Sequence, residues 1–259
     1  MEFSYISETE LPGKQTNVDN LQIIAHRYYW TSQFVAGKEV LEVACGPGFG
    51  LGFLANRAKK VIGGDITPEC LSLAGTHYGS RVELVGMDAH HLPFGDGCLD
   101  VVVSVAAIIY MDLPVFLREC ARVLKPEGVL ILNMPNQDAP GFSPSGLSRN
   151  YYSVCELSSL LSGNFETELF GAFPVPDSAR RFLRTLRVSV RRPAGAVLRT
   201  LGFFERVRGL VNSSTQNVRL PEELTDAEMR LVQHIPVVPL PANIPNRKYR
   251  IVYALARRN

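Results

Sequence analysis

Short β-rich segments alternate with helix-like segments through the first half of this chain. The β-rich segments are 39–44, 60–64, 81–85, 100–105 and 128–133, and the helix-like ones are 49–59, 68–77 and 114–124. Regular alternation of strand and helix predicts an α/β fold with a parallel sheet covered on both faces. In such sheets, ligands bind beyond the carboxyl ends of the strands, near the point where the strand order reverses.

The first β-rich segment leads into three glycines, in the stretch V-L-E-V-A-C-G-P-G-F-G of residues 40–50. Gly46, Gly48 and Gly50 allow a tight turn, and the absence of Cβ atoms lets a ligand approach the main chain. The helix that follows would point its amino-terminal N–H groups at the same place.

Acidic residues lie at three of the predicted strands. Glu42 is within the first, Asp65 ends the second in G-G-D-I, and Asp88 follows the third in G-M-D-A. Three carboxylates around one crevice are a poor setting for a pyrophosphate and a good one for a cation.

Four stretches together resemble the motifs of class I S-adenosylmethionine-dependent methyltransferases of the small-molecule type. They are V-L-E-V-A-C-G-P-G-F-G, G-G-D-I-T-P-E-C-L, G-M-D-A-H-H-L-P-F and R-V-L-K-P-E-G-V-L-I-L, in the family's order, within residues 20–136. The resemblance implies a Rossmann-like doubly wound seven-stranded sheet, mostly parallel with the last strand antiparallel. It also implies S-adenosylmethionine as the cofactor.

The resemblance can be carried over to individual positions. Glu42 and the backbone of Gly46 and Gly48 would hold the methionine part, Asp65 the ribose, and Asp88 the adenine amino group. The complete set of expected cofactor-binding residues is Tyr28, Glu42, Ala44, Gly46, Gly48, Asp65, Ile66, Asp88, Ala89, His90 and Val105.

Two other interpretations of these motifs were weighed. A nicotinamide dinucleotide site would need G-x-G-x-x-G, but the third glycine counted from Gly46 would fall at Leu51. The glycines could also serve only to turn the chain, with Asp65 and Asp88 capping helices.

No catalytic base can be assigned by position. Where related enzymes often carry polar groups after the fourth strand, this chain reads S-V-A-A-I-I-Y-M-D, and only Tyr110 remains. Tyr110, His26 and His234 are weak catalytic candidates. The five cysteines are scattered without a C-x-x-C pair, so neither a zinc site nor any other metal site is expected.

The second half predicts a helix, two strands and a long insertion between them. A Ser153-x-x-Glu156 capping box predicts a helix over 153–161, and 165–173 and 249–256 alternate like strands. In the resembled family the last two strands form a hairpin. We therefore expect a core of residues 1–173 plus 249–259, and a mainly helical acceptor-recognition cap at 174–248, with helices in its first part, at 197–211 and at 226–233.

Charge and motif content bear on the partners. Residues 1–135 hold 10 Lys and Arg against 15 Asp and Glu, whereas residues 136–259 hold 17 against 10. An arginine face at Arg180, Arg184, Arg187 and Arg191 leaves open an anionic acceptor, an acidic carrier protein or contact with a membrane surface. No nucleobase-methylation motif of the Asn/Asp-Pro-Pro-aromatic kind follows the fourth strand, so a nucleic-acid substrate is not expected.

The functional expectation is methyl transfer from S-adenosylmethionine to an oxygen or nitrogen of a small molecule, such as a natural product or sugar-containing metabolite. A cofactor-binding domain with a regulatory role and a carrier-bound acceptor are the alternatives. The first 15 residues resemble neither a signal nor a transit peptide, and the longest apolar stretch, 101–111, is too short to span a bilayer. We expect a cytoplasmic protein.

Overall fold

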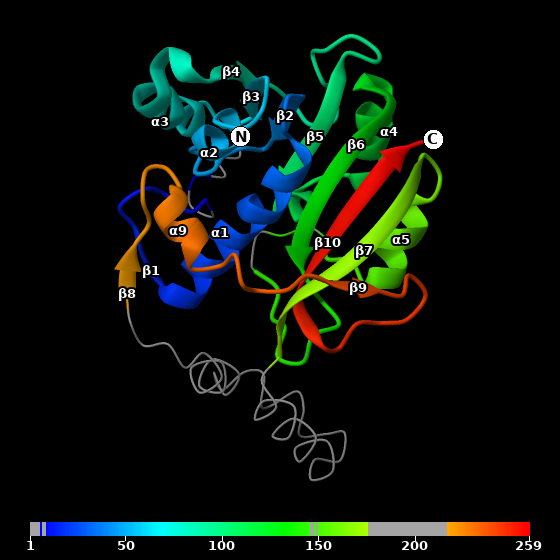
Figure 1. Cartoon of the computed structure of the whole chain (residues 1–259). Helices are drawn as coiled ribbons and strands as arrows, with labels where there is room; N and C mark the ends of the chain where they lie inside the picture. Colours follow the sequence, from blue (N-terminus) through cyan, green and yellow to red (C-terminus); the bar gives the residue numbers. More distant parts are fainter. Residues whose placement is uncertain (1–5, 7–8, 146–147, 149, 176–216) are drawn as a thin grey trace.

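The fold is known from a computed structural model, which describes residues 6, 9–145, 148, 150–175 and 217–259 (Figure 1). Its main feature is one mixed sheet with the strand order β4-β3-β2-β5-β6-β10-β7-β9. The strands are β2 (Glu39–Val43), β3 (Lys60–Asp65), β4 (Glu83–Gly86), β5 (Leu99–Val105), β6 (Leu124–Pro135), β7 (Phe165–Pro174), β9 (Val238–Leu240) and β10 (Tyr249–Arg258).

Strands β2 to β6 are parallel, and the strand order reverses between β2 and β5. β10 runs antiparallel to both β6 and β7, as the family resemblance led us to expect. The structure thus confirms an α/β Rossmann-like fold with a mostly parallel sheet. The reversal at β2 and β5 places a crevice at their carboxyl ends.

Helices cover both faces of this sheet (Figure 1). They are α1 (Val18–Thr31), α2 (Leu51–Ala55), α3 (Pro68–Tyr78), α4 (Leu113–Val123), α5 (Val154–Leu161) and α9 (Asp226–Arg230). Side chains of α1, α2, α3 and α9 belong to one buried apolar cluster, and those of α4 and α5 to a second.

Successive strand residues contribute their side chains to the two apolar clusters in alternation. Val101 and Val103 of β5 belong to the first cluster, whereas Val102 belongs to the second. This period of two is what a strand buried on both faces requires, because successive side chains point to opposite sides. The hydrophobic effect therefore fixes the sheet between the two helical layers.

The helix starts agree with their sequence signals. In α5 the Ser153 side chain accepts from the Glu156 amide, and the Glu156 side chain accepts from the Ser153 amide, so the predicted capping box is present. In α4 the Asp112 side chain caps the first turn by accepting from Val115 N–H. α2 is much shorter than the predicted segment 49–59 and ends at Ala55.

The sheet has one strand more than expected in the part of the chain that the structure describes. The extra strand is β9, which pairs with β7 at the edge of the sheet with Pro239 opposite Phe170. Proline lacks an N–H and is tolerated at a sheet edge, where no second neighbour needs that donor. Pro239 is therefore compatible with a place in an eighth, edge strand.

The insertion 174–248 is described only in part, because residues 176–216 lie outside the described ranges. The arginine face and the helix expected at 197–211 fall in that segment. In the described part of this range, residues 217–240 contain β8 (Asn217–Arg219), α9 and β9. β8 pairs with β1 (Gln15–Asn17), and the helix expected over 226–233 ends at Arg230.

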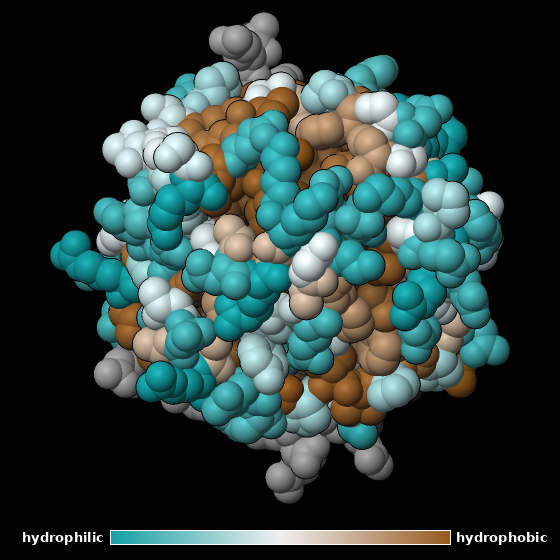
Figure 2. Space-filling model, turned by 45° about the horizontal axis from the view of Figure 1, so that its top comes forward, coloured by the Kyte–Doolittle hydropathy of each residue, from teal (hydrophilic) through white to brown (hydrophobic). Residues whose placement is uncertain are grey.

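The face shown in Figure 2 carries mostly polar side chains, with brown apolar areas between them. Ile66 is the most exposed large apolar side chain in the described ranges, at 57%. Within those ranges, no helix has the length and apolar character needed to cross a bilayer.

Candidate cofactor and acceptor cavity

A cavity of about 880 Å³ opens at the carboxyl ends of β2, β3 and β5. It extends from these strand ends to the loop after β6 and the start of β10. Nine of the expected cofactor-binding residues line it: Tyr28, Ala44, Gly46, Asp65, Ile66, Asp88, Ala89, His90 and Val105. Glu42 and Gly48 do not.

The backbone is strained where the two central strands enter the cavity. Ala44 follows β2 with φ 57°, and Ala106 follows β5 with φ 58°. Few residues with a Cβ adopt this left-handed region. Such outliers are concentrated at functional sites, where the surrounding structure must hold them in place. Two residues with positive φ at neighbouring strand ends therefore indicate a functional site at this edge of the sheet.

The three glycines do not share one role. Gly46 has φ 56° and lines the cavity, so it fits the expected close approach of a ligand. A Cβ on Gly50 would lie 2.0 Å from the Tyr28 ring, and one on Gly48 would lie 2.8 Å from a Leu51 methyl group. Gly48 and Gly50 therefore make room for the protein's own side chains, a distinction that spacing in the sequence cannot reveal.

Asp65 organises the turn after β2. Its Oδ2 accepts a hydrogen bond of 2.8 Å from Gly46 N–H, and its Oδ1 accepts one of 2.8 Å from Thr67 N–H. Asp65 is only 7% exposed yet lines the cavity. The carboxylate therefore joins the ends of β2 and β3 at a position where it can also face a ligand.

Asp88 is held by His90. The Asp88 carboxylate accepts from His90 N–H at 2.9 Å and from His90 Nδ1 at 2.7 Å, and His90 Nε2 accepts from Asp112 N–H at 2.9 Å. Because Nε2 is an acceptor, the proton of a neutral imidazole must be on Nδ1. Burial alone would raise the pKa of Asp88, but the bonds from His90 lower it, so the carboxylate is charged at neutral pH.

Glu42 lies behind the cavity lining. It is fully buried, its Oε1 accepts from Tyr28 O–H at 2.6 Å, and its Oε2 has no hydrogen-bond partner in the described structure. The pKa of Glu42 is raised to about 8, because burial, with a smaller contribution from nearby Asp65, outweighs the lowering effect of the Tyr28 bond. Tyr28, which does line the cavity, stands between Glu42 and the ligand space.

The three catalytic candidates occupy different environments. Tyr110 lines the cavity, whereas His26 and His234 do not. His26 is buried, with Nδ1 accepting from Tyr253 O–H at 2.6 Å and Nε2 facing Ile235 O at 3.2 Å. His234 is exposed. Only Tyr110 therefore has a position from which it could meet a ligand in this cavity.

Several cavity residues were not singled out from the sequence. One helical stripe of α1, Asn20, Ile23, Ile24 and Arg27, lines the cavity at the spacing i, i+3, i+4, i+7. That spacing can be found in the sequence. A helical stripe that packs into the core has the same period, however, so the spacing alone does not indicate a cavity wall. Other unforeseen residues include Thr9 and Glu10 near the amino terminus, Asn136 and 139–145 after β6, and Arg250 on β10.

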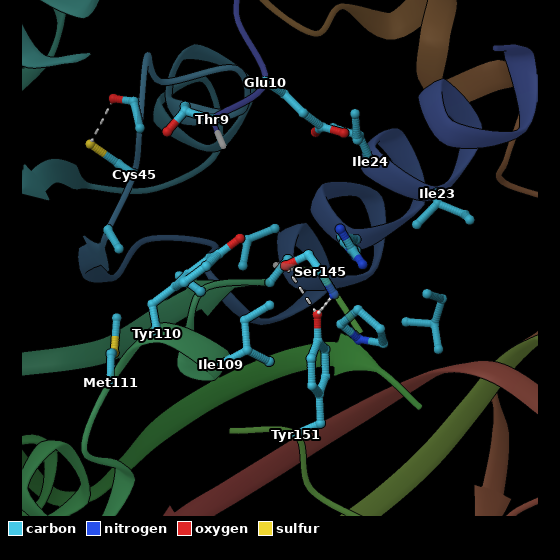
Figure 3. Close-up of a pocket in the computed structure, with 18 of the residues that line it drawn as sticks. Thr9, Glu10, Ile23, Ile24, Cys45, Ile109, Tyr110, Met111, Ser145 and Tyr151 are labelled. Carbon is cyan, nitrogen blue, oxygen red and sulfur yellow. Dashed lines mark hydrogen bonds between the residues drawn. The ribbon is translucent and has the colours of Figure 1, made fainter. Parts of the chain in front are cut away.

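Figure 3 shows how these segments enclose the space. Thr9, Glu10 and Ile24 lie on one side and Ile109 and Tyr151 on the other. The Tyr110 hydroxyl points into the space between the two sides.

The loop after β6 is tied down by its own hydrogen bonds. Ser145 N–H donates to Tyr151 Oη at 2.9 Å, and the Tyr151 ring packs edge-on against Phe142 at 4.7 Å. Asn136 donates to the carbonyls of Asn246 and Tyr249, both at 2.7 Å. The described wall on this side of the cavity is therefore fixed rather than loosely packed.

Comparison with known proteins agrees with this geometry. Residues 41–132 match the family described as "Methyltransferase domain". This segment is a methyltransferase domain, as the motifs led us to expect. The matched segment runs from β2 through most of β6, so the methyltransferase domain includes the strand ends that form the cavity.

Curated relatives match this methyltransferase domain and its surroundings. A probable S-adenosylmethionine-dependent methyltransferase of Mycobacterium tuberculosis is 33% identical over 181 residues, covering 64% of this chain and 65% of that protein. A fatty-acid O-methyltransferase of Mycolicibacterium smegmatis is 37% identical over 112 residues, covering 41% of each. The chain spans between 56% and 65% of the length of the first relatives it matches.

One solved structure illustrates the fold similarity. A methyltransferase of Thermotoga maritima, described as a possible histamine N-methyltransferase, superposes with a TM-score of 0.57 at 15% identity, covering 98% of this chain and 97% of that one. At this identity the similarity concerns the fold alone.

Proposed function

We propose that this protein transfers the methyl group of S-adenosylmethionine to an oxygen or nitrogen atom of a small-molecule acceptor. The observation that carries the proposal is a single cavity that joins the motif residues at the strand ends to an apolar region with no counterpart in the cofactor motifs. One end suits the cofactor, and the other offers room for an acceptor.

The motif end fits S-adenosylmethionine in its chemistry. The cofactor has cationic sulfonium and ammonium groups, and Asp65 and Asp88 both line this end of the cavity. Behind them, Glu42 has a buried oxygen without a hydrogen-bond partner in the described structure, and Tyr28 connects this residue to the cavity wall. Exposed Ile66 offers an apolar wall beside Asp65, and an adenine ring would bury it.

In this proposal the cofactor residues divide into two groups. Asp65 would hold the ribose hydroxyls, while Asp88, fixed by His90, would accept from the adenine amino group. Tyr28 and Gly46 would border the methionine part, with Glu42 acting through Tyr28 from behind. Gly48 would shape the turn without touching the cofactor.

The bound cofactor would supply an electrophilic methyl group, and the chain's contribution would be to position the acceptor and exclude water. Direct displacement needs the acceptor atom in line with the methyl group, and alignment alone can supply a large part of the acceleration. Tyr110 is the polar side chain best placed to orient an acceptor hydroxyl or amine. We assign no residue as a general base.

The far end of the cavity favours an acceptor with a sizeable apolar part. Ile23, Ile24, Ala139, Phe142 and Ile251 all line it. The relative from Mycolicibacterium smegmatis is described as a fatty-acid O-methyltransferase, which is compatible with such an acceptor. An acyl group bound to a carrier protein would fit the same lining. In this proposal, residues 174–248 would form a cap over the acceptor.

The proposal is tested first by ligand binding and then by turnover. Calorimetry with S-adenosylmethionine, S-adenosylhomocysteine and a nicotinamide dinucleotide should give binding for the first two only. Transfer of a labelled methyl group to members of an acceptor panel should then be detected. Heat with the dinucleotide and none with either methionine-derived ligand would reject the assignment.

The same experiments separate a second function. A regulatory domain that only senses the cofactor would bind both methionine-derived ligands and transfer no methyl group. The apolar part of the cavity beyond the motif residues favours the enzyme.

A further inference from the structure

Two arginines lie in the wall of the cavity without a counter-ion among the residues that the structure describes. Arg27 of α1 is 8% exposed, and Arg250 of β10 is half-buried. The Nε atoms of both are buried and have no hydrogen-bond partner, and no carboxylate in the described ranges lies within 4.0 Å of either guanidinium group.

Three other arginines of the described structure form ion pairs with carboxylates. Arg122 forms ion pairs with Asp96 and Glu119, and Arg57 and Arg81 pair with acidic residues. Burying a guanidinium group without a partner is costly because its donors lose water. Two such groups in one wall, neither paired with a carboxylate in the described ranges, therefore point to an anion that enters the cavity.

The two arginines belong to one part of the fold. The Arg250 guanidinium lies 5.6 Å from the centre of the Phe173 ring, and the same ring packs edge-on against His26, the neighbour of Arg27, at 5.1 Å. Arg250 is at the start of β10, where its carbonyl accepts from Asn136 N–H at 2.9 Å. Asp65 instead ends β3, and Asp88 follows β4.

Acidic groups near the arginines are weaker candidates for the missing partner. Glu10 and Asp19 raise the pKa values of Arg27 and Arg250, respectively, but burial outweighs them and both pKa values are lowered. The Glu10 side chain already accepts from Asn20 at 2.5 Å. Arginine retains its charge even when its pKa is lowered from this high value, so two positive charges remain in the wall.

We propose that Arg27 and Arg250 form an anion subsite for a carboxylate of the acceptor. The proposal rests on the proposed function and narrows its substrate class to amphipathic acids. An apolar chain would lie along Ile23, Ile24 and Ile251, and the two guanidinium groups would pair with the carboxylate.

Octanoate and octan-1-ol are suitable probes because they share an apolar chain and differ in charge. Binding of each should be measured by calorimetry with and without S-adenosylhomocysteine. The unmodified protein should bind octanoate more tightly than the alcohol. Arg27→Gln and Arg250→Gln should each weaken octanoate binding by about 10- to 100-fold, the range for losing a charge-assisted hydrogen bond, and leave the alcohol unchanged.

Arg257→Gln is the matched control, since Arg257 lies on the same strand and is exposed. Arg250→Lys should retain part of the preference for octanoate because it keeps the charge. Circular dichroism checks folding, and the Arg250 variants test the proposal independently should the buried Arg27 variant fail to fold.

The outcomes also separate this subsite from the proposed function. Equal binding of acid and alcohol, or equal losses for both in the variants, would overturn the subsite. Weaker binding of S-adenosylhomocysteine by Arg27→Gln, with octanoate binding intact, would assign Arg27 to the cofactor's carboxylate. This result would also overturn the proposed acceptor subsite. Failure of S-adenosylhomocysteine to bind the unmodified protein would reject the proposed function, while the octanoate comparison would still test the subsite.

Discussion

The Tyr28 hydroxyl donates a hydrogen bond of 2.6 Å to Oε1 of Glu42, which connects the middle of α1 to β2. Both side chains are buried, and the Tyr28 ring fills the space left by the missing Cβ of Gly50. A helix outside the matched segment 41–132 is thereby fixed to the first cofactor motif. Tyr28 is thus both a wall of the cavity and the support of a motif residue behind it.

Tyr28→Phe should lower the free energy of unfolding by about 1–3 kcal/mol, because it leaves Glu42 buried with neither oxygen bonded. Urea denaturation at pH 7 measures this change. Tyr29→Phe, on the same helix with a partly exposed side chain, should change stability by less than about 0.5 kcal/mol. Equal effects of the two substitutions would mean that the Tyr28–Glu42 bond contributes nothing specific.

Glu42 should make stability depend on pH between about 4.5 and about 8. Its pKa is raised from 4.5 to about 8, so between these values the folded state holds a proton that the unfolded state has released. Its contribution is complete below pH 4.5 and is lost as the pH rises to about 8, by at most about 1.4 kcal/mol per pH unit.

His26 acts in the opposite direction at lower pH. Burial lowers its pKa from 6.5 to about 4, so its contribution is present above pH 6.5 and is lost as the pH falls through 4. The effect of Glu42 is therefore best isolated between pH 6.5 and 8. Denaturation curves should show a decline over this interval that Glu42→Gln flattens, and an unchanged slope in that variant would assign the decline to other groups.

Asp65→Ala should weaken binding of S-adenosylhomocysteine by about 1–3 kcal/mol, since the carboxylate fixes Gly46 and Thr67 and would bond the ribose. Calorimetry measures the affinity. Asp96→Ala, at an exposed position away from the cavity, should bind as the unmodified protein does. Full affinity in the Asp65 variant would mean that Asp65 bonds only the backbone N–H groups and not the ribose.

His26→Phe should destabilise the fold by about 1–3 kcal/mol, because it removes the partner of the buried Tyr253 hydroxyl. It should not abolish methyl transfer at temperatures where the variant is folded, since His26 does not line the cavity. His234→Gln, at an exposed position, should change neither property. Loss of turnover with normal folding and cofactor affinity would instead identify His26 as functional.

Tyr110→Phe should retain measurable methyl transfer, with a loss below the roughly 100- to 10,000-fold typical of a missing general acid or base. The substitution should mainly raise the KM for the acceptor, because we propose that Tyr110 orients the acceptor. Rates and cofactor affinity measured on the same preparation separate the two roles. A loss confined to kcat and within the quoted range would make Tyr110 the catalytic base.

The sequence alone determined the order of strands and helices and the edge of the sheet at which a site would form. This was possible because both depend on local patterns: the period of apolar residues, the capping box at Ser153, and glycine and aspartate at strand ends. Nine of the eleven expected cofactor residues line the cavity for the same reason, since the motifs directly follow the strands.

Only the tertiary structure decided which of these residues face the ligand space. Glu42 and Gly48 lie next to cavity residues in sequence, yet one is covered by Tyr28 and the other packs against Leu51. Arg27 and Arg250 are more than 200 positions apart, and their placement in one wall depends on how α1 packs against β10. Such packing results from the summed burial of many side chains and leaves no local pattern in the sequence.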